Sequence, residues 1–192
     1  MKSSKPLSPL SSDCLEQLFN HIGPKEHSPE AIALEKTAGF SYRTVLGELM
    51  YAYITCRPDI GYAITTLSKF SSAPSAFHYT QLRHVAKYVR STIEWGIEFS
   101  RPEELKDLPQ TIEHTDLPKL DEEFPIDINV QKLLCFVDAS HATDLRKRRF
   151  ITGFVFTYCG DAIVYRSKTQ SITAGSSCES EFIAAYSACK VV

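Results

Sequence analysis

One carboxylate stands directly after an apolar run in the segment "KLLCFVDASHA", residues 132–142. The run, residues 133–137, predicts a buried strand because its polar flanks bound a short continuous apolar stretch. Asp138 follows it, and the small residues Ala139 and Ser140 come next. This Asp either initiates a turn or is an acid that a rigid strand holds for metal binding or catalysis.

Two further carboxylates, Glu179 and Glu181, lie in the segment "SSCESEFIAAYSACKVV", which predicts a helix. If this helix packs across the preceding strands, its first turn lies near the end of the strand that carries Asp138. Carboxylates that converge from a strand and a helix suit Mg²⁺ or Mn²⁺, and a pair of such ions can cleave phosphodiesters. Alternatively, Glu179 and Glu181 only complement the helix dipole.

The elements that must position these residues are three strands and a helix. The patterns predict strands at 132–138, 150–160 and 162–168, with a tight turn at Gly160–Asp161. The short connections favour an antiparallel meander. In the helix that follows, Ser177 is the expected N-cap. The stripe expected to be apolar consists of Phe182, Ala185, Tyr186 and Cys189.

The rest of the chain divides by composition. Residues 1–40 are predicted to be weakly structured apart from two short helices, in "SDCLEQLF" and "SPEAIALEKTA". Residues 41–100 predict three helices, a helix break with a local Arg57–Asp59 pair, and a strand at 93–100. Residues 101–130 hold nine acidic residues and four prolines, which indicates a solvated connector before residues 131–192. The expected fold class is α+β.

Composition limits the function classes. The 192 residues carry a net charge of −2, so any nucleic-acid surface must be a local patch. The run Arg146, Lys147, Arg148 and Arg149 is one candidate for phosphate contacts, although it also fits a solvated hairpin tip or a nuclear-localisation run. No apolar stretch is long enough to span a membrane, and no signal peptide is visible. Six cysteines without a CxxC pair favour a reducing compartment, the cytoplasm or nucleus, and argue against secretion.

Long ordered stretches resemble a known family. "VDAS", "ITGFVF" and "AIVYRSKTQSITAGSSCESEFIAAYSA" resemble the start of the ribonuclease H domain of copia-type LTR retrotransposon Pol polyproteins. "YRTVLGELMYAYITCRPDIGYAITTLSKF" resembles the segment between the reverse transcriptase core and that domain. The resemblance covers about residues 40–100 and 131–192. It implies that residues 41–100 are the helical tail of a reverse transcriptase and that 131–192 are the N-terminal half of a ribonuclease H-like domain.

The resemblance also implies roles for residues. Asp138 matches the family's first metal-binding Asp, Glu181 matches its catalytic Glu, and Glu179 is a neighbouring acidic position. Mg²⁺ or Mn²⁺ is then the expected cofactor, an RNA–DNA hybrid the expected substrate, and the remainder of the polyprotein the expected partner. Many members read Asp-Ala-Asp-Trp where this chain reads Asp138-Ala139-Ser140-His141.

The family's remaining metal-site acids lie beyond the first helix, and this chain ends within that helix. Its paired-Asp polymerase strand is expected upstream. The chain alone is therefore expected to be an inactive fragment of an enzyme that cleaves RNA in RNA–DNA hybrids. A non-catalytic remnant or a nucleic-acid-binding module is the alternative.

Overall fold

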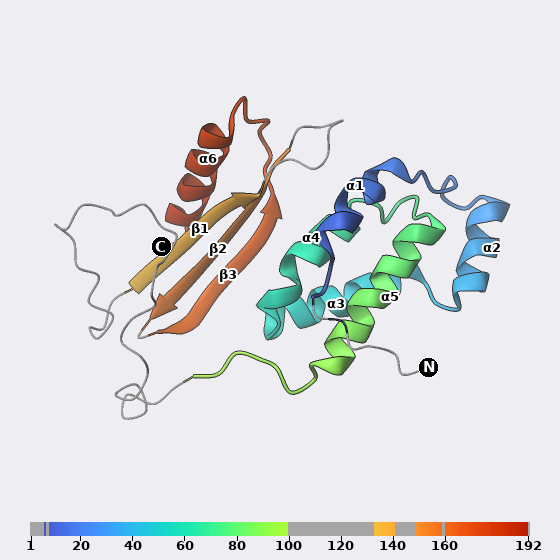
Figure 1. Cartoon of the computed structure of the whole chain (residues 1–192), viewed down its shortest axis with the longest axis horizontal. Coiled ribbons are helices and arrows are strands. Elements are labelled where there is room, and N and C mark those ends of the chain that lie inside the picture. Colours follow the sequence, from blue (N-terminus) through green and yellow to red (C-terminus); the bar gives the residue numbers. More distant parts are fainter. Residues whose placement is uncertain (1–5, 7, 100–132, 141–148, 159, 192) are drawn as a thin grey trace.

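The fold consists of a helical unit beside a small sheet that carries one helix on its face (Figure 1). In this computed structural model the described residues are 6, 8–99, 133–140, 149–158 and 160–191. The expected α+β class is confirmed. The acidic connector, residues 101–130, lies outside the described residues.

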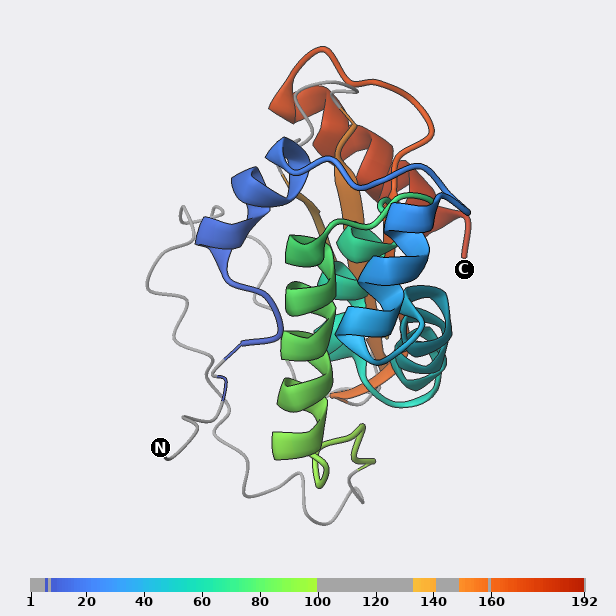
Figure 2. The same ribbon diagram turned by 90° about the vertical axis from the view of Figure 1, so that its right-hand side faces the viewer.

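Five helices and one 3₁₀ turn form the helical unit, which lies in front of the sheet in Figure 2. They are α1 (Ser12–Asn20), α2 (Pro29–Ala38), α3 (Tyr42–Thr55), η1 (Pro58–Ile60), α4 (Gly61–Ser68) and α5 (Ala76–Ser91). Their largest fully buried apolar side chains include Leu18, Ile60, Ile64, Leu67 and Leu82. No helix among the described residues has the length and apolar content needed to cross a bilayer.

Local sequence signals explain where several of these helices begin and end. Ser28 caps α2 as expected, since its hydroxyl accepts from the Ala31 N–H at 3.2 Å, with Pro29 in the first helical position. Gly39 ends α2 in the left-handed conformation, with φ 79°. Pro58 separates α3 from α4 and opens η1.

The prediction of a strand at residues 93–100 is wrong. Residues 93–99 form no strand, and the Trp95 N–H donates to the Thr92 carbonyl in a turn. The alternation of apolar residues there has no neighbouring strand to pair with among the described residues. An extended segment needs such a partner to become a strand.

Residues 1–40 supply the two short helices predicted from the sequence, and one of them contributes to the core. Leu18 in α1 is fully buried, and its carbonyl lies 2.9 Å from Nε2 of His78 in α5. His78 Nδ1 accepts from the Ser75 N–H at 2.8 Å, so Nε2 carries the proton and donates to Leu18. The neutral imidazole therefore fastens α1 to the start of α5.

We expect the contact between His78 and Leu18 to weaken at acid pH. Burial first, and then the nearby His21, hold the pKa of His78 below its ordinary 6.5, although the Leu18 bond acts to raise it. Between the folded pKa and 6.5 the unfolded chain binds more protons than the folded chain, so stability is complete above about pH 6.5 and falls below it. Urea unfolding from pH 7.5 to 5 measures this fall.

His78→Gln should flatten that pH profile, and His27→Gln, whose side chain is 89% exposed, is the control. If the pH profiles of the parent chain and of His78→Gln coincide, His78 does not cause the loss of stability at acid pH.

Three antiparallel strands form the sheet in the order β1-β2-β3, which confirms the predicted meander. They are β1 (Leu133–Ser140), β2 (Ile151–Tyr158) and β3 (Asp161–Thr169). Gly160, with φ 89°, supplies the left-handed residue that the β2–β3 turn requires. A bulge interrupts the β2–β3 register at Phe156/Thr157.

The expectation that the run before Asp138 is buried is wrong. In β1, Leu133 is 46% exposed and Phe136 is 52% exposed. Among the described residues β1 pairs only with β2, so its other edge is open. An apolar run thus predicted the strand correctly but not its burial.

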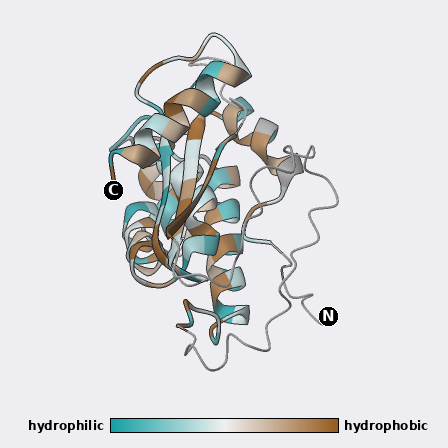
Figure 3. Cartoon of the chain, turned by 90° about the vertical axis from the view of Figure 1, so that its left-hand side faces the viewer, coloured by the Kyte–Doolittle hydropathy of each residue, from teal (hydrophilic) through white to brown (hydrophobic). Residues whose placement is uncertain are grey.

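Helix α6 (Ser177–Cys189) packs on one face of the sheet over β1 and β2. Its buried residues are Ser180, Ala184 and Ala188. The prediction that the stripe with Phe182 and Tyr186 faces the sheet is wrong, because these side chains are 72% and 63% exposed. Small residues at i, i+4 and i+8 let the helix approach the strands closely, and the larger side chains then lie outside. In Figure 3, where the ribbon is coloured by hydropathy, the hydrophobic residues of α6 appear in brown.

The helical unit closes the outer edge of β3. The Ser167 N–H donates to Tyr53 Oη at 2.6 Å, and the Ser167 carbonyl accepts from Thr65 Oγ1 at 3.0 Å. Tyr165 Oη donates to the carbonyls of Tyr53 and Ile54 at 2.9 and 3.0 Å. The two Ser167 bonds satisfy backbone groups that an unprotected edge strand would leave open, and the Tyr165 bonds satisfy carbonyls in the last turn of α3.

Candidate active site

Asp138 lies within β1, not at its end. Two more strand residues follow it, and its cross-strand partner is Gly153. The neighbouring Val137 packs toward α6, in the cluster that includes Ala188. Because side chains alternate across a strand, Asp138 points to the opposite face of the sheet.

On that opposite face Asp138 lines a groove of about 480 Å³ between the sheet and the helical unit. Aromatic residues make up much of its wall, namely Tyr53, Tyr62, Phe136 and Tyr165. Asp138 itself is exposed. The carboxylate is thus open to solvent beside an aromatic surface.

The two glutamates of α6 differ in their surroundings. Helix α6 is capped by Ser176, one residue earlier than expected, whose hydroxyl accepts from the Glu179 N–H at 3.1 Å. Glu179 Oε2 accepts from the Gly175 N–H at 2.6 Å. Glu179 thus reaches back to the residue before the N-cap and satisfies a free N–H there, so it has a structural role at the helix start. Glu181 is exposed.

A short chain of contacts brings the start of α6 to the level of Asp138. Gln170 Nε2 donates to the Ser180 carbonyl at 2.9 Å and to Thr152 Oγ1 at 3.1 Å. Thr152 pairs with Ala139, the residue after Asp138. Glu181 and Asp138 therefore lie at the same end of the sheet, with Glu181 on the helix that covers one face and Asp138 pointing to the other.

The acidic residues fit a divalent cation only in part. Carboxylate oxygens are the ligands that Mg²⁺ and Mn²⁺ prefer. However, no group of three or more His, Cys, Asp or Glu side chains among the described residues is placed to hold a metal ion. Asp138 and Glu181 alone do not complete a site for two ions.

Of the four basic residues predicted to contact nucleic acid, Arg149 is exposed just before β2. Arg146, Lys147 and Arg148 lie outside the described residues. Arg149 lines a second groove, together with Lys69 of the helical unit.

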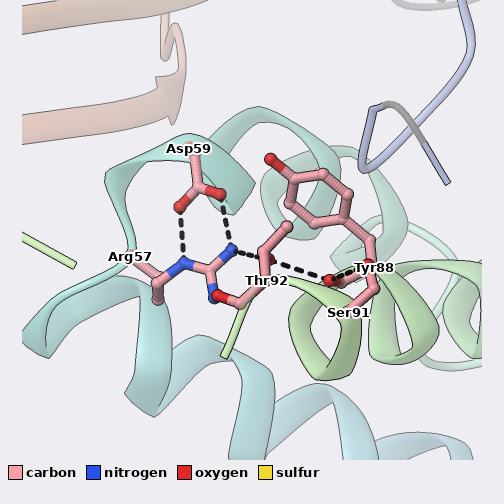
Figure 4. Close-up of polar contacts among 5 residues, drawn as sticks. All are labelled: Arg57, Asp59, Tyr88, Ser91 and Thr92. Atoms are coloured by element: carbon pink, nitrogen blue, oxygen red, sulfur yellow. Dashed lines mark hydrogen bonds and ion pairs between the residues drawn. The ribbon is translucent and has the colours of Figure 1, made fainter. Parts of the chain in front are cut away.

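The most developed polar cluster lies around Arg57 (Figure 4). Arg57 is 4% exposed and makes a two-point contact with Asp59, at 2.9 and 2.7 Å. Its guanidinium also donates to the Thr92 carbonyl and hydroxyl at 3.0 and 2.7 Å and lies 5.7 Å from the centre of the Tyr88 ring. The sequence predicted the local pair, and the structure adds the contact with the end of α5. These partners define a structural clamp.

The fold and site define an α+β protein with an Asp on a strand and a Glu in a helical first turn at one end of an antiparallel sheet. Among relatives, a secreted RxLR effector protein 161 of Plasmopara viticola is 31% identical over 143 residues, 74% of this chain and 82% of the relative. The Pol polyprotein from transposon TNT 1-94 of Nicotiana tabacum is 29% identical over 96% of this chain and 12% of the polyprotein. An uncharacterised mitochondrial protein of Arabidopsis thaliana is 27% identical over 87% of this chain and 63% of that protein.

The chain belongs to the copia-type retrotransposon Pol family and corresponds to a fragment of such a polyprotein. No family model matches the chain, and no solved structure matches it. The chain spans about an eighth of the tobacco polyprotein.

Proposed function

We propose that this chain contributes the tail of a reverse transcriptase and the first part of a ribonuclease H domain, whose parent hydrolyses the RNA strand of RNA–DNA hybrids. The observation that supports this most directly is the placement of Asp138 and Glu181 at one end of the sheet, in a chain of the Pol family. Both carboxylates stand on rigid elements, and the shared ion that the resemblance implies would have to be reached from the two faces of the sheet that they occupy.

In this proposal Asp138 and Glu181 are the acids that would hold Mg²⁺ or Mn²⁺, which supplies charge stabilisation for phosphodiester cleavage when bound. Glu179 keeps its structural role at the start of α6. Since the described residues do not complete a two-ion site, the missing ligands must come from elsewhere in the parent. The parent would act inside the cell, in the cytoplasm or nucleus, on a hybrid made by the same polyprotein.

The test compares two proteins on a hybrid with labelled RNA in Mg²⁺. The 192-residue chain alone should not cleave, because two carboxylates cannot fix two ions. The chain joined to the downstream half of a related ribonuclease H domain should cleave. Cleavage by the chain alone that is lost on Asp138→Asn would contradict the incomplete-site argument. A joined protein that binds the hybrid but never cleaves it would favour a non-catalytic nucleic-acid-binding module.

A further inference from the structure

Positive charge gathers in two grooves on either side of the end of β3. The first, of about 250 Å³, lies between β3 and α6 and is lined by Arg166, Lys168 and Lys190. The second, of about 450 Å³, lies between the helical unit and the start of β2 and is lined by Lys69 and Arg149. Thr169 lines both grooves, so the two grooves meet at the end of β3.

No Asp or Glu is among the described residues that line either groove. The other grooves differ. Asp59 and Asp138 line the groove between the sheet and the helical unit, which Arg166 also borders, and Glu26 and Glu35 line the groove beside α2. The chain as a whole has a net charge of −2. The five cations are therefore a local concentration of positive charge against an acidic background.

The fold explains why two of these cations stand on the sheet. Arg166 and Lys168 alternate along β3, so they share the face that α6 covers over β1 and β2. Helix α6 leaves this part of β3 uncovered, and both residues are exposed. Long charged side chains occupy a place where a packed sheet would carry apolar ones.

Simpler roles account for only two of the five. Lys190 follows α6 and lies 4.3 Å from the Tyr186 ring centre, and Lys69 follows α4 and lies 5.5 Å from the Phe19 ring centre. Each complements the negative end of its helix. Neither effect explains Arg149, which lies just before β2, or Arg166 and Lys168, which stand on β3.

We propose that these five residues, Lys69, Arg149, Arg166, Lys168 and Lys190, form a phosphate track that binds the backbone of a nucleic-acid duplex. Thr169 and Ser140 both pair with Ile151, so the track reaches the end of the sheet where Asp138 lies. A duplex held there passes beside the candidate active site. The inference that the ligand is a duplex rests on the proposed function. The inference that the ligand is an anion rests on the charges of the five residues alone.

Binding of the full chain to a duplex DNA and to an RNA–DNA hybrid, measured by fluorescence anisotropy in EDTA at several salt concentrations, tests the track. Each phosphate contact contributes about 0.9 to the slope of log affinity against log salt for duplex DNA. Arg166→Gln with Lys168→Gln and Lys190→Gln should lower the slope by up to about 2.7, and Lys69→Gln with Arg149→Gln by up to about 1.8.

The matched control removes three exposed cations from α2 and α5, through Lys36→Gln, Lys87→Gln and Arg90→Gln. It removes as many positive charges as the variant with Arg166, Lys168 and Lys190 replaced, and it should leave the slope nearly unchanged. An equal loss in the control, or no binding by the parent chain, would overturn the track. If a combined variant unfolds, Arg166→Gln and Lys168→Gln are measured singly, each expected to lower the slope by up to about 0.9.

Because EDTA removes Mg²⁺, the anisotropy experiment measures binding of the duplex without any cleavage. If the track variants lose binding while Asp138 and Glu181 prove irrelevant to hydrolysis in the joined protein, the proposed function fails and the track remains. The opposite pattern, carboxylate-dependent hydrolysis with no effect of the five cations on binding, refutes the track alone.

Discussion

Asp138→Asn and Glu181→Gln should each lower the rate of RNA cleavage by the joined protein about 100-fold or more, the loss typical when one electrostatic group is removed from a reaction site. Each substitution keeps the shape of the side chain and removes its negative charge. Both residues are exposed, so neither change removes packing. Single-turnover cleavage of a labelled hybrid measures the effect, and urea unfolding checks that the fold is retained.

Glu179→Gln is the matched control, two residues away on the same helix. Its amide oxygen can still accept from the Gly175 N–H, as Glu179 does at 2.6 Å, so both helix start and cleavage rate should change little. If Glu179→Gln abolished cleavage and Glu181→Gln spared it, the catalytic Glu would have been assigned two residues too far along α6. If none of the three mattered, the likeness to the Pol family would reflect ancestry without shared chemistry.

Elements with strong local signals were predictable from the sequence. The three strands follow from short runs rich in β-branched and aromatic residues, and Gly160 marks the turn between β2 and β3. The start of α6 was predicted within one residue, because Ser176 and Ser177 are both chemically able to cap it.

Burial was harder to predict, because it depends on what covers an element and not on its own pattern. The large apolar residues of α6, including Phe182 and Tyr186, suggested the wrong inner face. The helix instead turns Ser180, Ala184 and Ala188 inward, where small side chains permit close contact. The exposure of β1 likewise depends on which strands lie beside it.

Contacts between distant residues carry no local signal. Tyr53 and Ser167 are 114 positions apart, yet their bond helps to join the helical unit to the sheet. The candidate site shows the same limit. The types and spacing of Asp138 and Glu181 suggested a shared site, but only the packing of the neighbouring Val137 toward α6 shows to which face of the sheet Asp138 points.

The largest stability effect is expected at the Arg57 clamp. Asp59→Ala should lower the free energy of unfolding by about 2 to 3 kcal/mol, because it leaves the almost fully buried Arg57 guanidinium without its carboxylate. The loss is below that for a fully buried pair, since the Asp59 side chain is 30% exposed. Burial acts to raise the pKa of Asp59, but the Arg57 hydrogen bond and charge outweigh it and hold that pKa below its ordinary value. Urea unfolding at pH 7 measures the loss.

The exposed pair between Arg43 and Glu26 is the control for this prediction. Its N–O distance is also 2.7 Å, but the side chains are 57% and 41% exposed, so Glu26→Ala should cost about 1 kcal/mol or less. Arg57→Met combined with Asp59→Ala should cost less than the two single changes added together, because the double variant no longer buries an unpaired charge. Additive losses would mean that the two residues act independently. In that case the bonds from Arg57 to Thr92, rather than the ion pair, would be what fixes the end of α3 against α5.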